Sequence, residues 1–227
     1  QSRRLEEITL LDDIKRVKQS LLQEVEQLRD AVRDKEARDG DKIEALSRQV
    51  AVLNRKLQSA RSESERDGLT GILNRRTFDR YLTDLISRNT VTRQKVALLL
   101  VDIDDFKRIN DAHGHLTGDS VLAAVVKKFR QSVRGEDVLA RFGGEEFAIV
   151  LPGASLRNAL KKGRQICEAI ASTRYVLEGL PTREELALTV SIGVSCCRAD
   201  DTVASLIDRA DKALYLAKRS GKNRAVS

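Results

Sequence analysis

The chain has 227 residues, and its 41 Lys and Arg against 34 Asp and Glu give a net charge of +7. That length accommodates one globular domain and an accessory element, and the basic balance suits a partner that carries phosphate. Nucleic acid is disfavoured, because aromatic residues make up only 4% of the chain and Trp is absent. A polyanionic small molecule fits the charge equally well.

The sequence also bears on the compartment. The three cysteines, Cys167, Cys196 and Cys197, lack metal-ligand spacing, so we expect reduced, packed cysteines in the cytoplasm rather than a disulfide framework. No run of about 18 apolar residues occurs, and no segment is predicted to span a membrane. The chain begins at Gln1 and contains no Met, which leaves room for an upstream anchor or sensor.

The region from residue 5 to residue 60 has the pattern of a coiled coil. It lacks Pro, and its apolar residues recur at steps of three and four. A helix with such a stripe is unstable alone in water, so we expect it to pair with a second copy or with a regulatory protein. The alternative is a helix that packs on its own globular domain. The stripe consists of Leu11, Ile14, Leu21, Val25, Leu28, Val32, Ile43, Leu46, Val50, Leu53, Leu57 and Ala60.

One discontinuity interrupts this stripe. From Val32 to Ile43 the step is eleven residues, which a stutter in one continuous helix absorbs as three, four and four. The alternative is a helical hairpin that turns at Asp39-Gly40-Asp41. We favour the continuous helix, because the eleven-residue step keeps the stripe in phase without a loop.

Two glycines, Gly68 and Gly71, end the heptads, and alternating strand and helix patterns follow. We assign residues 1–66 to a helical stalk and residues 67–227 to a globular domain. For this domain we predict an α/β sandwich, a mixed sheet with an antiparallel hairpin and helices on its faces. The predicted elements are strands at Val96–Ile103, Val138–Phe142, Phe147–Leu151 and Leu186–Val194, helices at Leu122–Val133 (preceded by Gly118-Asp119), Leu156–Ile170 and Val203–Lys218 (ended by Gly221), and a loop or small hairpin at Leu177–Glu185.

Two acids stand on the tip of the predicted hairpin. Gly143-Gly144 is expected to supply the positive φ angles of a two-residue hairpin loop, and Glu145 and Glu146 follow directly. Folding alone does not need adjacent acids there, so the pair predicts a bound cation. The alternative is a surface hairpin with solvated charges.

A second acidic set ends the strand Val96–Ile103. Alternation places Asp102 and Asp104 on one side of the strand end, where carboxylates beside backbone carbonyls suit Mg²⁺. If this strand end lies beside the hairpin tip, Asp102 and Glu145 can share one cation. The alternative for Asp104 or Asp105 is to cap a helix at this junction.

Seven short segments of the globular domain follow one another in a recognisable order and spacing. They are Asp67–Arg76, Val101–Lys107, Asn110-Asp111, Gly114-His115, Gly118-Asp119, Arg141–Phe147 and Lys218–Asn223. Together they resemble the diguanylate cyclase, or GGDEF, domain, which has a fold of the nucleotidyl-cyclase type. The glycine hairpin alone would be weak evidence, but the series is specific. The resemblance runs from Asp67 to Ala225, makes residues 67–227 a catalytic domain, and leaves the stalk outside.

Members of that family condense two GTP molecules into cyclic di-GMP and release two pyrophosphates, with each domain of a dimer holding one GTP. The resemblance implies that Asp102, the carbonyl of Ile103 and Glu145 hold Mg²⁺, with Mn²⁺ as an alternative ion. It implies that Glu146 joins a second ion or assists deprotonation of the attacking 3′-hydroxyl. A metal clamp fits phosphoryl chemistry, which needs charge neutralised and the nucleophile held in line. Glu145 stands where the family name has Asp, and active members carry either acid.

The resemblance also implies the substrate contacts. An amide and a carboxylate complement the donor edge of guanine, and both kinds of side chain are present. For the two lysines near the C-terminus, the alternative is a favourable place at the end of a helix. Lys222 stands where Arg is commoner, which weakens the phosphate grip. The implied substrate-binding residues are Asn110 and Asp119 on guanine, Phe106, and Lys218 and Lys222 on the phosphates, with Lys107 as a further catalytic residue there.

Arg134 and Asp137 match by position the Arg-x-x-Asp site at which the family's product inhibits the enzyme. An Arg and a carboxylate can hold a guanine base between them. The alternative is an exposed salt bridge in a loop. His113 and His115 are too few for a zinc site and are expected in the loop before a helix.

We expect the stalk to pair two chains in parallel as a homodimer and to bring the two Gly143-Gly144 tips face to face. The rival function is a non-catalytic receptor or scaffold that holds cyclic di-GMP at Arg134 and Asp137 and binds a partner through the stalk. A pure receptor has no reason to keep the acids together with a guanine-reading pair. A DNA-binding zipper is disfavoured, because no basic region precedes the heptads.

Overall fold

The computed structural model describes residues 16–30, 32–33, 35, 39, 42, 44, 46–53, 65–92, 94–176 and 185–227. The chain divides into two units, Gln1–Arg61 and Ser62–Ser227. No helix within these described ranges is both long enough and apolar enough to cross a bilayer.

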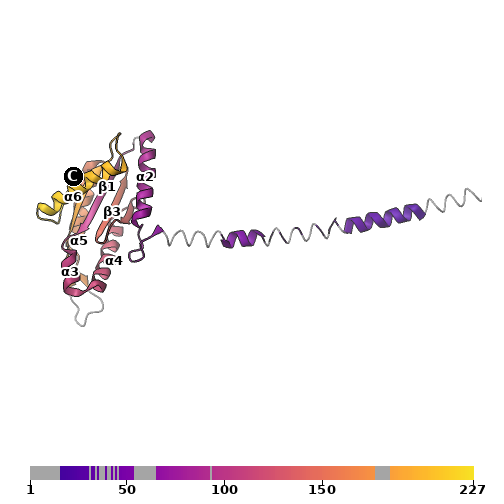
Figure 1. Cartoon of the computed structure of the whole chain (residues 1–227), viewed down its shortest axis with the longest axis horizontal. Coiled ribbons are helices and arrows are strands. Elements are labelled where there is room, and N and C mark those ends of the chain that lie inside the picture. The colour runs from indigo at the N-terminus through magenta and orange to yellow at the C-terminus, as the bar shows by residue number, and fades with distance from the viewer. Residues whose placement is uncertain are drawn as a thin grey trace, which may run out of the picture. The chain divides into compact units, whose positions relative to one another are not determined.

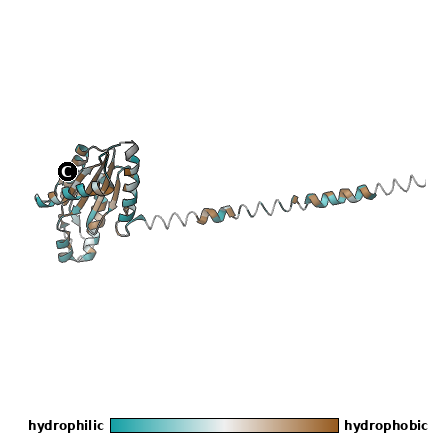
Figure 2. Cartoon of the chain, turned by 45° about the horizontal axis from the view of Figure 1, so that its top comes forward, coloured by the Kyte–Doolittle hydropathy of each residue, from teal (hydrophilic) through white to brown (hydrophobic). Residues whose placement is uncertain are grey.

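The described residues of the first unit are helical, including residues 16–30 and 46–53. Their large apolar side chains are exposed, by 66% at Leu28 and 71% at Leu53. Figure 2 shows these apolar residues in brown among polar ones in teal. Such exposure is typical of a helix that pairs with another chain. The hairpin alternative depends on Gly40 and Asp41, which lie outside the described residues, as do Leu11, Ile14, Ile43, Leu57 and Ala60 of the predicted stripe.

The second unit is built on a five-stranded sheet with the strand order β2-β3-β1-β6-β7. All neighbouring strands are antiparallel except β6 and β7. A separate antiparallel pair, β4 (Tyr175–Val176) with β5 (Glu185–Leu186), flanks residues 177–184, which lie outside the described residues. The strands of the main sheet are β1 (Val96–Ile103), β2 (Val138–Arg141), β3 (Glu146–Pro152), β6 (Val190–Cys196) and β7 (Ala225–Val226).

Helices cover both faces of this sheet (Figure 1). Strand alternation decides which side chain meets which helices: Leu99 and Val101 of β1 enter one core, and Leu98 and Leu100 enter the other. The first core lies under α3 (Phe106–His113), α4 (His115–Ser132) and α5 (Leu156–Ala171), and the second under α2 (Arg75–Thr92) and α6 (Val203–Arg219).

The contact between α6 and the sheet is unusually close. At Gly193 of β6, a Cβ would overlap the Ala210 carbonyl and the Leu214 backbone of α6. Only glycine admits the helix at this distance. The close approach holds the last turn of α6, which carries Lys218, over the end of β1.

The predicted fold class is confirmed, while several predicted elements differ in detail. The strand predicted at Leu186–Val194 is divided, because Leu186 belongs to β5, which pairs with β4, whereas the residues from Val190 onward belong to β6, which pairs with β1. The prediction that Gly118-Asp119 precedes a helix is wrong, since α4 begins at His115. The loop predicted for His113 and His115 is also wrong: they end α3 and begin α4. Helices α2 and α3 and strand β7 were not predicted from the sequence.

Candidate active site

The candidate active site lies where β1 ends beside the start of β3. Asp102 is only 4% exposed, and the sheet register places it directly opposite Glu146. Glu145 is held at the same edge, because its carbonyl accepts a hydrogen bond from the Ile103 N–H (3.3 Å). Two like charges on directly opposed residues destabilise a sheet, so this arrangement needs a compensating positive charge.

Lys218 supplies part of that charge. Its Nζ atom lies 2.7 Å from Asp102 Oδ2. The pKa of Asp102 is nevertheless raised to about 6, first by burial and then by the charges of Glu145 and Glu146, against the hydrogen bond and the charge of Lys218. The site therefore carries more negative charge than its lysine neutralises.

These carboxylates fit a divalent cation by their chemistry, since hard oxygen donors with excess negative charge suit Mg²⁺. In the described part of the chain, no three or more His, Cys, Asp or Glu side chains form a ready-made metal cluster. Asp102 contacts Lys218 instead. Binding of a cation to Asp102 would thus require the Asp102–Lys218 ion pair to break.

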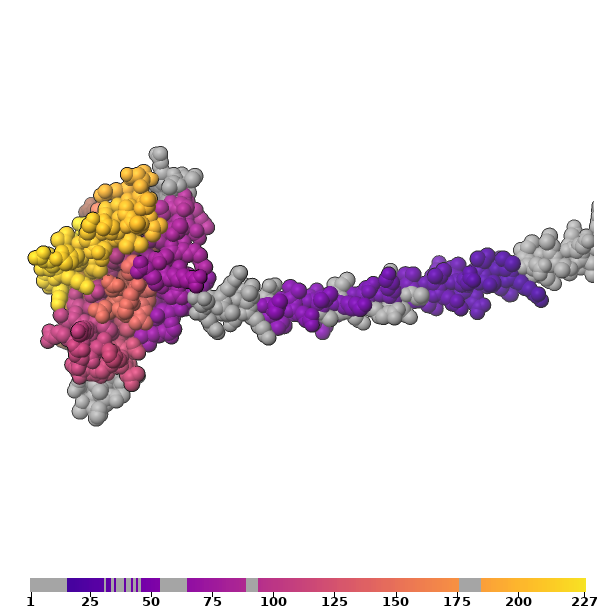
Figure 3. All heavy atoms as spheres, viewed as in Figure 1, coloured from indigo at the N-terminus to yellow at the C-terminus, as the bar shows by residue number. Residues whose placement is uncertain are grey.

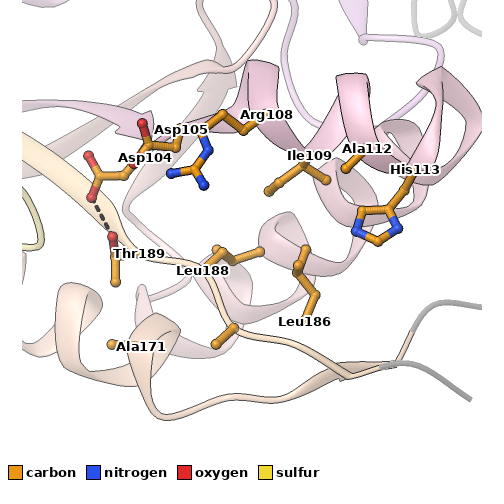
Figure 4. Close-up of a pocket in the computed structure, with 11 residues that line it drawn as sticks. Asp104, Asp105, Arg108, Ile109, Ala112, His113, Ala171, Leu186, Leu188 and Thr189 are labelled. Atoms are coloured by element: carbon orange, nitrogen blue, oxygen red, sulfur yellow. Dashed lines mark hydrogen bonds between the residues drawn. The ribbon is translucent and has the colours of Figure 1, made fainter.

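Asp104 and Asp105, which follow β1, have different environments. Asp104 accepts hydrogen bonds from Thr189 Oγ1 (2.6 Å), Ser191 Oγ (2.7 Å) and the Asn223 backbone N–H (3.1 Å). It ties the end of β1 to β6 and to the segment after α6, so it is a structural residue rather than a cap. Figure 4 shows Asp104 and its hydrogen bond to Thr189 at one end of a hollow between α3 and the segment that leads into β6.

Asp105 occupies the N-cap position of α3, but among the described residues its side chain makes no capping hydrogen bond. Its Oδ1 atom lies 2.7 Å from Nζ of Lys222. The capping interpretation is therefore wrong for Asp105, whose carboxylate is committed to an ion pair.

The hairpin tip is a four-residue loop from Phe142 to Glu145, between the strand ends Arg141 and Glu146. Neither glycine of the tip has a positive φ, so the predicted two-residue turn is wrong. Gly143 lies against the Glu146 side chain, and a Cβ there would displace the Glu146 carboxylate. The loop thus folds the Glu146 side chain back over its own backbone.

Two arginines hold this loop. Arg141 donates to the Gly144 carbonyl (2.8 Å) and forms an ion pair with Asp67 (3.1 Å). Arg75 of α2 stacks over the Phe142 ring, 3.3 Å from its centroid, and donates to the Phe142 carbonyl (3.2 Å). Figure 3 shows the coral hairpin segment at the surface between the yellow α6 and the purple α2. The roles of these two arginines were not predicted from the sequence.

The α3–α4 corner brings Asn110 and Asp119 close together in the fold. A Cβ at Gly118 would overlap the Asn110 amide and press on the Phe106 ring, so glycine lets the helices meet there. Among the described residues, Asn110 Oδ1 is buried without a hydrogen-bond partner, while the neighbouring Asp119 is exposed. A buried acceptor without a donor is costly and points to a ligand that supplies one.

The remaining predicted residues lie around these acids. Lys107 is exposed in the first turn of α3, whereas Phe106 is only 5% exposed and packs in the core. Lys218 lies in the last turn of α6 and Lys222 after it. The structure therefore gathers the acids, both C-terminal lysines and the β1–α3 turn at one edge of the sheet.

Arg134 and Asp137 lie in the turn between α4 and β2. Asp137 Oδ2 accepts a hydrogen bond from the Arg134 backbone N–H (2.8 Å), while the Arg134 guanidinium is 76% exposed and approaches Glu136 (3.6 Å). The simple Arg134–Asp137 side-chain salt bridge is therefore not what this turn forms. Both residues line a surface hollow with two further arginines, Arg66 and Arg130, which gives it a positive character.

Comparison with known proteins identifies this arrangement. Residues 64–224 match the family described as diguanylate cyclase, GGDEF domain. The chain is 35% identical over 188 residues to the diguanylate cyclase DgcP of Pseudomonas aeruginosa, an alignment that covers 81% of this chain and 27% of DgcP. The chain spans between 27% and 53% of the length of the curated relatives it matches.

Two solved structures resemble the chain over most of its length. The coiled coil and GGDEF domain of DgcB from Caulobacter crescentus, solved in complex with c-di-GMP, matches with a TM-score of 0.76 and 31% identity over 84% of this chain and 97% of that one. The diguanylate cyclase SiaD of Pseudomonas aeruginosa, solved in complex with its activator SiaC, matches with a TM-score of 0.75 and 31% identity over 99% of this chain and 86% of that one. This chain belongs to the GGDEF family of diguanylate cyclase domains.

Proposed function

We propose that this chain catalyses the condensation of two GTP molecules into cyclic di-GMP, with each globular domain of a homodimer holding one GTP. The observation that carries the proposal is the acid pair Asp102 and Glu146, opposed across β1 and β3 with Glu145 beside them. Excess negative charge at a buried strand end is costly for folding and useful for holding a cation.

Asp102, the Ile103 carbonyl and Glu145 would hold Mg²⁺ or Mn²⁺, with Glu146 as a further ligand. When bound, the ion would neutralise part of the negative charge of the triphosphate. The pKa of Asp102 is raised mainly by burial and further by the charges of Glu145 and Glu146, so a bound cation would relieve a cost that this carboxylate carries. Glu146 would join a second ion or assist deprotonation of the attacking 3′-hydroxyl.

The guanine base is assigned to the α3–α4 corner. Asn110 Oδ1 is the buried acceptor that, within the described residues, has no donor, and the N–H groups of guanine supply one. Asp119, next to Gly118, would accept from the same edge of the base. Phe106 contributes the ring that packs under this corner rather than a surface for the ligand.

Lys107, Lys218 and Lys222 would hold the phosphates. In the reaction the 3′-oxygen of one GTP bonds to the α-phosphorus of the other, the bond from that phosphorus to the bridging oxygen breaks, and pyrophosphate leaves. Two such steps close the ring and release two pyrophosphates. Each step needs atoms from two domains, so one domain alone binds GTP without completing the product.

The stalk is the proposed dimer interface. Its exposed stripe favours a parallel pair of helices, which raises the effective concentration of one active site near the other to about the millimolar range. DgcB was solved with its coiled coil, and SiaD with an activator protein. We extend both features to this chain: a homodimer through the stalk, and a regulatory protein that acts on it.

The arginine hollow at Arg134 and Asp137 is the proposed site of product inhibition. Its three arginines and one carboxylate suit a ligand with two phosphates and a guanine edge, as cyclic di-GMP has. The same hollow is the specific observation that favours the rival function, a non-catalytic cyclic di-GMP receptor. The acids at β1 and β3 favour the enzyme.

The test is to incubate the chain with GTP and Mg²⁺ and to separate the nucleotides by chromatography. The proposal predicts cyclic di-GMP and two equivalents of pyrophosphate. Binding of added cyclic di-GMP without any cyclic product from GTP, at protein concentrations where the chain is a dimer, would favour the receptor instead.

A further inference from the structure

Three non-glycine residues in the described part of the chain have a positive φ, and they meet at one place. Asp105 (57°) precedes α3, and Lys222 (57°) and Asn223 (49°) follow α6. The Asn223 N–H donates to Asp104, and Lys222 Nζ donates to Asp105. Left-handed backbone at non-glycine residues is strained and tends to gather at functional positions.

The Asp105–Lys222 ion pair does not stabilise the fold enough to explain the strained backbone at these residues. The Lys222 and Asp105 side chains are 41% and 48% exposed, and such a pair adds little to folding. Asp105 does not cap α3 with its side chain either, as far as the described residues go. The carboxylate at this position therefore requires another explanation.

Lys222 is one of two lysines that contact an aspartate at this edge. Lys218 Nζ lies 2.7 Å from Asp102, and Lys222 Nζ lies 2.7 Å from Asp105. The proposed function assigns both lysines to phosphate. Each ammonium thus holds a carboxylate oxygen where a phosphate oxygen is expected. Asp102 would pass to the cation when nucleotide binds, but Asp105 has no such destination in the proposed metal site.

Arg108 offers Asp105 a second partner. The pKa of Asp105 lies below its ordinary value, mainly because Lys222 donates a hydrogen bond to it, and the charge of Arg108 adds to the effect. Figure 4 shows the Arg108 guanidinium beside the turn that carries Asp104 and Asp105. A second cation nearby makes it easier for Asp105 to release Lys222.

Resting on the proposed function, we propose that Asp105 is a positioning residue that sets the affinity for nucleoside triphosphate. Its carboxylate occupies on Lys222 the place of a phosphate oxygen, and nucleotide binding exchanges one anion for the other. The exchange makes or breaks no covalent bond. A triphosphate competes better for the lysine than ligands of lower charge do.

The test compares Asp105→Asn with the wild type in the full 227-residue chain. Asn tolerates a positive φ as well as Asp does, so the turn is preserved. Calorimetry with Mg²⁺ and 3′-deoxy-GTP, which lacks the hydroxyl that the proposed reaction uses, measures affinity without turnover. We expect D105N to bind about threefold to tenfold more tightly and to lower the KM of GTP by a similar factor, with kcat unchanged.

The matched control is Asp208→Asn. It removes the same charge from a different exposed ion pair, Asp208–Lys212 on α6. The lysine Nζ and the carboxylate oxygen lie 2.7 Å apart in this pair, as they do in Asp105–Lys222. We expect D208N to bind 3′-deoxy-GTP within about twofold of the wild type. In a Lys222→Met background, D105N should have no effect on affinity, because the lysine that it releases is gone.

Equal affinity of D105N and the wild type would overturn the proposal, as would an equal gain in D208N or a gain that persists without Lys222. Binding of inorganic triphosphate distinguishes failure of the Asp105 proposal from failure of the proposed function. Tighter binding of inorganic triphosphate to D105N, with no cyclic product from GTP in either protein, would uphold the role of Asp105 and reject the cyclase. Absence of binding of both probes to both proteins would reject the two together.

Discussion

The two units of the chain place their apolar residues in opposite environments. Leu28 and Leu53 of the stalk are 66% and 71% exposed, whereas Phe78 and Phe129 of the globular unit are fully buried, at 0%. The globular unit completes its core within one chain, and the stalk does not. Substitutions in the globular unit should therefore change turnover equally at every protein concentration. Substitutions in the stalk should change turnover most at low concentration, where they oppose pairing.

The largest effect should come from Asp102→Asn, which changes the site and leaves the stalk intact. The pKa of Asp102 is raised to about 6 in the folded protein and is about 4 in the unfolded chain. Ionisation of Asp102 therefore lowers the free energy of unfolding as the pH rises above about 4, and the full loss is present above about pH 6. In EDTA at pH 8, D102N should melt about 2 to 4 °C higher than the wild type. Turnover of GTP should fall roughly a thousandfold.

Scanning calorimetry and the chromatographic assay measure these two quantities. Asp84→Asn, on the exposed side of α2, is the control and should change neither. A D102N protein that loses stability as well as turnover would show that the carboxylate supports the fold, contrary to the excess charge inferred here.

The second effect should come from the stalk, through Leu21→Asp combined with Leu28→Asp. Two charges on the apolar stripe oppose pairing, so turnover at about 0.1 µM enzyme should fall roughly a hundredfold and should recover as enzyme concentration rises. Affinity for 3′-deoxy-GTP should not change.

The matched control is Gln23→Asp combined with Gln27→Asp, which adds the same charges on the opposite side of the helix. Sedimentation with parallel assays over a range of concentrations gives both mass and rate. If the loss of turnover is the same at every concentration, the stalk does not act by pairing.

A smaller effect is expected at the α3–α4 corner from Gly118→Ala. Alanine gains helix propensity of about 1 kcal/mol over glycine, while the added Cβ displaces the Asn110 amide and presses on Phe106. The urea midpoint should thus change little, but the KM of GTP should rise about tenfold as the amide moves. In an Asn110→Ala background the same change should leave the KM unaltered. A G118A protein with wild-type KM would place guanine elsewhere.

The smallest effect concerns acid stability of the globular unit. Asp201 accepts from Arg209 (2.6 Å), and mainly for that reason the pKa of Asp201 lies below its ordinary value. A depressed carboxyl pKa stabilises the fold above the unfolded value near pH 4, and this stabilisation is lost as the pH falls through the folded value. Arg209→Leu should lower the free energy of unfolding by about 1 to 2 kcal/mol at pH 7 and by less at pH 3.

Urea titrations at the two pH values provide the measurement. Lys212→Met, which breaks the exposed Asp208–Lys212 pair on the same helix, should change stability little at either pH. An Arg209→Leu deficit that is the same at pH 3 and pH 7 would mean that packing, not charge, explains the loss.

Local patterns predicted some elements well and missed others for identifiable reasons. The bounds of β1 match the apolar run Val96–Ile103, because a strand buried on both faces is continuously apolar. The spacing of Phe78, Leu82 and Ile86 could have revealed α2, since all three are buried at helical steps. By contrast, α3 has only eight residues and follows a left-handed Asp105, so no periodicity marks it.

The site divides in the same way. The family resemblance implied that Asp102, Glu145 and Glu146 act together, but nothing in the sequence predicted that Glu146 rather than Glu145 is the cross-strand partner of Asp102. That pairing is set by the register between β1 and β3, two strands far apart in the sequence, and a one-residue shift of this register would place Glu145 opposite Asp102.

The sequence by itself determined the family, the apolar patterns of both units and the residue types that carry the chemistry, because each depends on neighbours in the chain. Only the tertiary structure decided which distant residues meet. Asp104 is bound by Thr189, Ser191 and Asn223, and Asp105 is paired with Lys222 more than a hundred residues away. The contacts with Thr189 and Ser191 depend on the pairing of β1 with β6, and those with Lys222 and Asn223 on how α6 packs on the sheet. No local pattern encodes either.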